Sequence, residues 1–146
     1  MKPPKTAIYA IKAMIYLAER DELRGRAMAP CHQIAEAGDM PERFLLQILR
    51  ALANAGLLRS SRGIEGGFGL ARRPEEVSLL EILEAVEGPA DFTPALRPYF
   101  AGENRERTMA NLEETCHELT DALARRSLAD LCADASCSAK PLSHRT

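Results

Sequence analysis

The chain has 146 residues, enough for one domain with a modest core, and its 46% hydrophobic and 27% charged residues are ordinary for a soluble globular protein. Its most apolar early segment, residues 7–18, is interrupted by Lys12 and is too short for a membrane span or a signal peptide. We therefore expect a cytoplasmic protein with no membrane partner. The net charge of −2, taken alone, argues against a nucleic-acid partner.

The two halves of the chain differ in charge. Residues 1–73 hold 12 Lys or Arg against 7 Asp or Glu, whereas residues 74–146 hold 7 against 14. Neutralising phosphates requires locally clustered positive charge rather than a basic total. The asymmetry fits a DNA-binding part joined to a part that stays off DNA, and it also fits a charged surface with no partner.

The sequence predicts two helices before residue 40. The first, around residues 7–18, has apolar side chains at helical spacing: Ile8, Ile11, Met14, Ile15, Leu17 and Ala18. The second is short, covers residues 30–37, directs Ile34 and Ala35 inward and ends at Gly38. We expect the first helix to pack beneath the short helix and the one that follows it.

The next helix is predicted to begin at Pro41, which suits the first helical position, and to stop before Gly56, which favours left-handed backbone. One face is apolar: Phe44, Leu45, Ile48, Leu49, Leu52 and Ala55. The other face carries side chains that point one way together: Arg43, Leu46, Gln47, Arg50 and Asn54. Two helices joined by a turn are typical of a helix-turn-helix, whose second helix enters the DNA major groove.

Side chains on that outer face suit base recognition. Arg43 can donate two hydrogen bonds to guanine and Gln47 can pair with adenine, while Leu46 can touch a thymine methyl. Exposed Arg and Gln are also common on any helix, and Leu46 can instead pack at a protein interface. The assignment to the DNA face is therefore stronger than the assignment to particular bases.

A tight hairpin is predicted directly after this helix. Leu57 and Leu58 begin a strand, residues 63–67 supply three glycines for the turn, and residues 68–70 return. Arginines surround the hairpin: Arg59, Arg62, Arg72 and Arg73. An isolated hairpin of this kind is ordinarily a solvated surface feature, but its place after an arginine-bearing helix favours a wing that contacts nucleic acid.

The second half is predicted to be helical around one loop. A capping box at Ser78 and Glu81 opens a helix that ends at Gly88, and residues 89–103, rich in proline and glycine, are expected to form a loop. From residue 104 a heptad-like stripe follows: Met109, Leu112, Cys116, Leu119 and Leu123. We expect residues 104–131 to form a dimerisation helix and a short helix after it, and residues 132–146 a flexible tail.

Four ordered segments resemble the Rrf2-type transcriptional regulators, a winged helix-turn-helix family whose members dimerise through a long C-terminal helix. These segments are YAIKAMIYLA (residues 9–18), IAEAGDMPERFLLQILRALANAGLLRSSRGIEGGF (34–68), SLLEILEAVEG (78–88) and SLADL (127–131). The resemblance implies that Arg43, Phe44 and Gln47 begin the recognition helix and that Arg62 reaches a minor groove.

Several relatives hold an iron–sulfur cluster in the loop that precedes the dimerisation helix. In this chain the corresponding residues are Pro94, Phe100, Glu106 and Met109, and no cysteine occurs between Cys31 and Cys116. Thiolate ligation of a cluster normally needs several convergent cysteines, so we expect no cluster, no other cofactor and no metal site.

The four cysteines have plainer interpretations. Cys31 and Cys116 are expected to be small buried apolar side chains, and Cys132 and Cys137 are expected near the tail. Thiol sensing through Cys116, Cys132 or Cys137 stays open as an alternative, as does an unknown small-molecule effector. A Ser-His-Asp order, a glycine-rich phosphate loop and paired catalytic carboxylates are not indicated, so an enzyme is not expected.

The sequence thus predicts a mainly α fold with a small β-hairpin wing: a winged helix-turn-helix domain over residues 1–88 and a long C-terminal dimerisation helix. The expected function is that of a homodimeric regulator that binds double-stranded DNA at a pseudo-palindromic operator through seven residues: Arg43, Phe44, Leu46, Gln47, Arg50, Arg59 and Arg62. The main alternative is a winged-helix protein-interaction module that has lost DNA binding, with Leu46 on the outer face as its best support.

Overall fold

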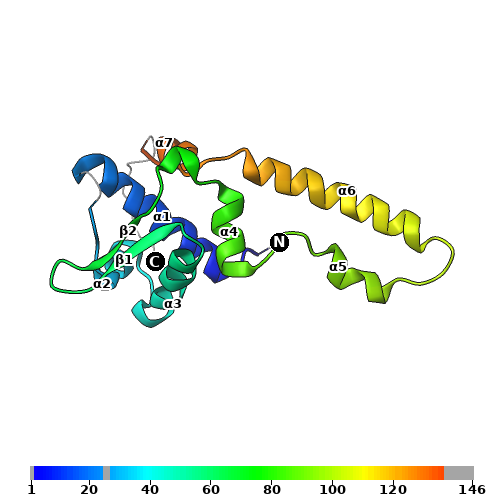
Figure 1. Ribbon diagram of the computed structural model, residues 1–146, viewed down its shortest axis with the longest axis horizontal. Coiled ribbons are helices and arrows are strands. Elements are labelled where there is room, and N and C mark those ends of the chain that lie inside the picture. Colours follow the sequence, from blue (N-terminus) through cyan, green and yellow to red (C-terminus); the bar gives the residue numbers. More distant parts are fainter. Residues whose placement is uncertain (1, 25–26, 137–146) are drawn as a thin grey trace, which may run out of the picture.

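A computed structural model describes residues 2–24 and 27–136. It has a helical body that carries a two-stranded hairpin, and an arm that extends away from this body (Figure 1). The body contains α1 (Lys5–Arg24), α2 (Cys31–Gly38), α3 (Glu42–Asn54), β1 (Leu58–Ser61), β2 (Gly67–Leu70), η1 (Pro74–Glu76), α4 (Leu79–Glu87) and α7 (Leu128–Ser136). The arm contains α5 (Thr93–Leu96), η2 (Arg97–Tyr99) and α6 (Arg105–Ala124). The predicted fold class is confirmed.

The core of the body forms around α1, which packs against α2, α3, α4, α7 and β2. Met14 and Leu17 of α1 are fully buried together with Leu45 and Leu49 of α3. The expected first helix is confirmed and is longer at both ends than the apolar pattern indicated. Ile8 differs from the expectation, since it is 38% exposed at the start of α1.

The turn between α2 and α3 is held by backbone geometry. Asp39 adopts a left-handed conformation with φ of 51°, and the Met40 amide donates to the carbonyl of Ala35 at 2.9 Å. Pro41 has ψ of 119°, so it is the N-cap of α3 rather than its first helical residue, although its carbonyl already accepts the Leu45 amide. At the other end Gly56 has φ of 78°, which confirms the predicted stop.

The hairpin pairs β1 and β2 in antiparallel register, from Leu58 opposite Leu70 to Ser61 opposite Gly67. It is anchored to the body by Ala29, whose amide and carbonyl both bond to Phe68 at 2.9 and 2.8 Å. Gly67 lies so close to the Ala29 carbonyl that any Cβ there would overlap it. The wing is therefore a fixed extension of the body.

The predicted capping box of α4 is confirmed. The Ser78 hydroxyl accepts the Glu81 amide at 3.1 Å, and the Glu81 carboxylate accepts the Ser78 amide at 2.9 Å. The pKa of Glu81 is lowered: partial burial opposes the shift, and the hydrogen bonds from Ser78 and Arg72 outweigh it.

Residues 89–103 are not the plain loop that the sequence suggested, because they contain α5 and η2. The prolines that indicated a loop, Pro94 and Pro98, occupy the first turns of these short helices, where proline is tolerated. Asp91 precedes α5 and accepts hydrogen bonds from the amide and hydroxyl of Thr93 at 3.0 and 2.5 Å.

The stripe on α6 does not form one uniform surface. Met109 and Cys116 are 1% and 3% exposed within the single chain, where α6 packs against α4 and α5, whereas Leu119 is 49% exposed. The expectation that all five stripe residues meet a partner is thus revised for Met109 and Cys116, which their own chain already covers. Leu112 and Leu123 are half-buried.

The prediction of a flexible tail is wrong for residues 132–136, because these residues belong to α7. Leu128 and Cys132 are 0% and 7% exposed and lie in the core of the body, so α7 returns the chain to α1 after the arm. Cys137 and the rest of the predicted tail lie outside the described residues.

Candidate nucleic-acid interface

The outer face of α3 presents three long polar side chains: Arg43, Gln47 and Arg50 are exposed. Leu45, Ile48, Leu49 and Leu52 on the opposite face are buried, and this fixes the rotation of the helix on the body. The spacing predicted from the sequence therefore gives one polar face. The function of this polar face depends on the neighbouring wing and on the groove between them.

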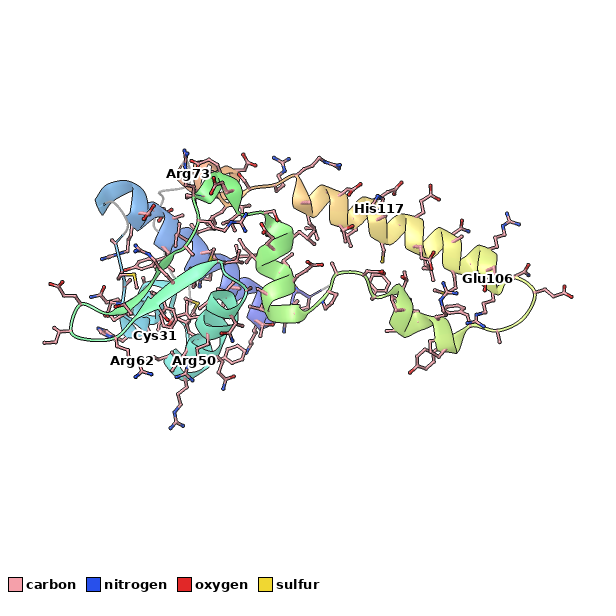
Figure 2. The ribbon with its side chains drawn as sticks, viewed as in Figure 1. Cys31, Arg50, Arg62, Arg73, Glu106 and His117 are labelled. Carbon is pink, nitrogen blue, oxygen red and sulfur yellow. The ribbon has the colours of Figure 1, made fainter. Side chains whose placement is uncertain are left out.

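The wing places a third cation beside this face, which itself carries two arginines. Figure 2 shows Arg50 of α3 and Arg62 of the hairpin along the same edge of the body. Between α3 and the hairpin lies a groove of about 550 Å³ that both arginines line. Among the described residues, Arg43, Arg50 and Arg62 form no ion pair with an acidic side chain, so their charge is directed to solvent.

The groove also contains two hydroxyl groups that sequence reasoning missed. Ser60 and Ser61 of β1 line it together with Asn54, which was predicted on the outer face of α3. Such side chains commonly donate to phosphate oxygens and fix the position of a protein on DNA. The available signal was the pair of serines between Arg59 and Arg62 on one strand.

Leu46 is not the freely exposed outer residue that the sequence suggested. It is half-buried, packs against the core and lines the groove next to Phe68. Leu46 therefore helps to join α3 to the wing. The alternative that used Leu46 as an exposed protein-docking residue loses its main support.

Phe44 also has an internal role. Its ring packs edge-on against Tyr9 of α1, with ring centroids 5.7 Å apart and planes at 75°. This contact ties the start of α3 to α1. Phe44 therefore supports α3 from the inside and does not lie on its outer polar face with Arg43 and Gln47.

Arg59 lies apart from the groove. It is half-buried and lines a separate pocket with Asp21, Arg72 and Arg73. Arg72 is paired with Glu81 at 2.6 Å, and hydrogen bonding to that carboxylate raises the pKa of Arg72. The four arginines predicted around the hairpin are thus divided. Arg62 lies beside α3, whereas Arg59, Arg72 and Arg73 line the separate pocket.

Cys31 lies beside the start of α3. It is half-buried at the start of α2, with its Sγ 3.7 Å from the Glu42 carbonyl oxygen. Burial, together with the charge of Glu42, raises the pKa of the Cys31 thiol. A raised pKa keeps the thiol protonated and unreactive at neutral pH.

The fold and this surface define the chain as a winged helix-turn-helix protein. The sequence profile of the Rrf2 family, described as an iron-dependent transcriptional regulator, matches residues 4–134. The chain belongs to the Rrf2 family of transcriptional regulators, as the resemblance indicated. Among the residues that the structure describes, no helix is long and apolar enough to cross a membrane.

Individual relatives agree with this family. The chain is 35% identical over 88 residues to an rrf2-like helix-turn-helix regulator of Rhodobacter capsulatus, covering 60% of this chain and 59% of that protein. It is 33% identical over 89 residues to CymR of Bacillus subtilis, covering 61% and 62%. The matched part therefore spans less than two thirds of these relatives, and they are regulators rather than enzymes.

Solved structures resemble the whole chain. CymR, described as the global cysteine regulator of B. subtilis, is 26% identical with a TM-score of 0.69, and the match covers 92% of this chain and 98% of that one. IscR of T. potens is 27% identical with a TM-score of 0.73, covering 98% and 94%.

The residues of the arm do not fit the iron that the family description implies. Pro94 and Phe100 offer no side-chain donor, the Glu106 carboxylate lies 3.9 Å from the Arg97 guanidinium, and Met109 is buried. Across residues 2–24 and 27–136, no three His, Cys, Asp or Glu side chains are grouped so that they could hold a metal ion.

Proposed function

We propose that this protein is a sequence-specific DNA-binding regulator that places α3 in the major groove and the wing against the adjoining minor groove. The observation that carries the proposal is the joint placement of Arg43, Gln47 and Arg50 on α3 with Arg62 across the groove. Gln47 and Arg43, near the start of α3, are the base-reading residues, because the N-terminal part of a recognition helix lies closest to the base edges. Arg50, Arg62 and the groove hydroxyls position the backbone.

The protein acts as a homodimer on a pseudo-palindromic operator. The arm provides the surface for the second copy, since Leu119 is 49% exposed on α6 and continues the line of the half-buried Leu112 and Leu123. A symmetric pair would present two reading helices to two half-sites.

The regulator works without an iron–sulfur cluster. The arm carries a single cysteine, Cys116, and a cluster needs several convergent thiolates. Its signal then comes from a small molecule or from thiol chemistry. The raised pKa of Cys31 and the burial of Cys116 and Cys132 favour a small molecule over oxidation.

Anaerobically purified protein should contain no stoichiometric iron or sulfide and should still be folded. A coloured, iron-loaded protein that a triple substitution of Cys116, Cys132 and Cys137 by Ser bleaches would overturn this part of the proposal.

DNA binding is tested by selecting duplexes from a random pool and measuring affinity by fluorescence anisotropy. Arg62→Ala should weaken binding to all DNA, whereas Gln47→Ala should narrow the gap between operator and random DNA by about 1–3 kcal/mol. Arg107→Ala is the matched control, because Arg107 is an exposed arginine on the arm. It should leave both affinities unchanged.

Salt distinguishes this function from a protein-interaction module. Binding through arginines should weaken steeply as salt rises, because bound phosphates release counterions. Failure to enrich any sequence, with binding to another protein that salt does not affect, would favour the interaction module. Equal losses for Gln47→Ala and Arg62→Ala on operator and random DNA would overturn the division between reading and positioning.

A further inference from the structure

The tip of the wing is a tight turn that presents a large apolar side chain. The Gly66 amide donates to the Gly63 carbonyl at 3.0 Å, which makes Ile64 and Glu65 the two central residues of the turn. Gly, Pro, Asn, Asp and Ser are the commonest turn residues, although turns without a positive φ at these positions accept most side chains. Ile64 is a large apolar side chain, and it is fully exposed, at 106% of its reference area.

The turn around Ile64 is closely packed, so this exposure is built into the hairpin. A Cβ on Gly66 would meet the Ser61 carbonyl and the Arg62 backbone, and Gly67 lies against Ala29. Gly63 has φ of 109°, which glycine adopts without strain. Ile64 contributes nothing to the core, so the whole apolar surface of its side chain is available to a group that the wing contacts.

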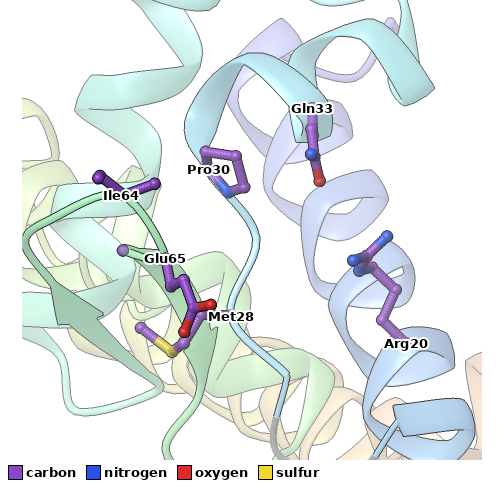
Figure 3. A pocket seen from close by; sticks show the side chains of 7 residues that line it. Arg20, Met28, Pro30, Gln33, Ile64 and Glu65 are labelled. Atoms are coloured by element: carbon purple, nitrogen blue, oxygen red, sulfur yellow. The ribbon is translucent and has the colours of Figure 1, made fainter.

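The neighbouring residue, Glu65, is also exposed. Figure 3 shows the shallow pocket that Glu65 lines together with Met28, Pro30 and Gln33. Ile64 lines the same pocket. Its side chain is fully exposed at the tip of the wing, two residues after Arg62.

We propose, on the basis of the proposed DNA-binding function, that Ile64 enters the minor groove and selects A·T base pairs beneath the wing. Guanine places its N2 amino group in the minor groove, where a close apolar side chain would obstruct and desolvate a donor that it cannot satisfy. A·T pairs lack that group, and their narrower groove brings the sugar walls closer to the side chain. Arg62 supplies the attraction, and Ile64 supplies the discrimination.

The test is a parallel selection from a random pool with the full-length wild type, Ile64→Asn and Glu65→Ala. Asparagine suits a turn, so Ile64→Asn should keep its thermal stability. The wild type should enrich A·T pairs at the outer edge of each half-site, and Ile64→Asn should lose that enrichment while keeping the inner motif. Glu65→Ala is the matched control on the adjacent residue: it should raise affinity for all sequences, because it removes a negative charge near phosphates, and it should leave the preference unchanged.

Base analogues then identify the group that is read. Replacing an outer A·T pair by G·C should weaken wild-type binding about fivefold. Inosine·C, which lacks the N2 amino group, should restore it, and neither change should affect Ile64→Asn. Unchanged outer preferences in Ile64→Asn, or no rescue by inosine, would overturn the inference while leaving the proposed function intact. Failure of the wild type to select any motif would overturn both.

Discussion

The body and the arm of this protein are stabilised in different ways. Buried apolar side chains from α1, α3, α4, α7 and the hairpin fill the body. In the arm only Met109, Cys116 and Thr93 are buried, while Phe92, Tyr99 and Leu119 are 49%, 85% and 49% exposed. Exposed ion pairs, such as Arg97 with Glu113 at 2.7 Å, hold the arm together.

The charge of the two regions differs in the same way. Residues 89–124 hold 7 Asp or Glu against 3 Lys or Arg, whereas residues 1–73 are basic. A long helix that is polar around most of its surface is poorly stabilised by its own chain. The body thus has a buried core of its own, whereas the arm leaves leucine and aromatic side chains exposed, which the proposed second copy would cover.

The largest expected effect is on the core of the body. Leu49→Ala removes a fully buried side chain of α3 and should lower the free energy of unfolding by about 2–5 kcal/mol. Leu112→Ala, at a half-buried position on α6, should cost clearly less in urea denaturation at low protein concentration. Equal losses would mean that the arm is as well packed as the body and would remove the contrast.

A second substitution tests whether a second copy of the chain covers the arm. Leu119→Asp should weaken the proposed dimer by about 3 kcal/mol, since in each of two symmetric copies the exposed half of a leucine is no longer covered and a carboxylate is placed in an apolar contact. That corresponds to about a hundredfold higher dissociation constant, measured by sedimentation. The resulting monomers should bind DNA poorly, because each grips one half-site.

The control for this substitution is Ala110→Asp. Ala110 is exposed and lies nine residues from Leu119, which is half a turn around α6, so it adds the same charge to the opposite face. It should leave the oligomeric state unchanged. An unchanged sedimentation coefficient for Leu119→Asp would show that the dimer surface lies elsewhere.

How far the sequence predicts the molecule also differs between the two regions. Local signals suffice in the body: Gly56 ends α3, Ser78 and Glu81 cap α4, and the glycines of residues 63–67 turn the wing. These features depend on neighbours within a few residues. The fold and the polar face of α3 were predictable for that reason.

Predictions that depend on distant partners were less successful. Phe44 packs against Tyr9 in α1, and Leu46 packs against the core and lines the groove that Phe68 of the wing also lines, so their roles depend on contacts that spacing cannot show. Cys132 joins the core because α7 returns to α1 after the arm. The prolines of residues 89–103 favour a loop in the sequence, although proline also begins short helices, as Pro94 and Pro98 do here.

A smaller effect is expected from the ion pairs of the arm. Arg97 lies between Glu113 at 2.7 Å and Glu106 at 3.9 Å, and its side chain is 42% exposed. Arg97→Ala should therefore lower the stability of the arm by at most about 1 kcal/mol. The loss should be smaller in 1 M salt, where the Debye length is only about 3 Å. Hydrogen exchange of residues 93–99 measures it locally. Arg125→Ala, at an exposed arginine after α6, is the control, and a loss that salt does not change would exclude an electrostatic role.

The smallest expected effect is on the pH dependence of stability. It concerns one aspartate at a helix start in each region, Asp130 in the body and Asp91 in the arm. The backbone amide and hydroxyl of Ser127 lower the pKa of Asp130 at the start of α7, and the hydroxyl and amide of Thr93 lower the pKa of Asp91 at the start of α5. A lowered folded-state pKa means that the stabilisation is present above the ordinary aspartate value of about 3.9 and is lost as pH falls below it. Asp130→Asn should thus be less stable than the wild type at pH 7, and the difference should fade below about pH 4.

The two caps should be visible to different measurements. Asp130 holds a helix that packs against α1, so global unfolding of the body should report its loss. Asp91 holds only the start of the arm, so Asp91→Asn should change hydrogen exchange around α5 and leave the unfolding of the body unaltered. If Asp91→Asn destabilised the body as much as Asp130→Asn does, the arm and the body would unfold as one cooperative unit, and a second copy would not be needed to explain how the arm is held.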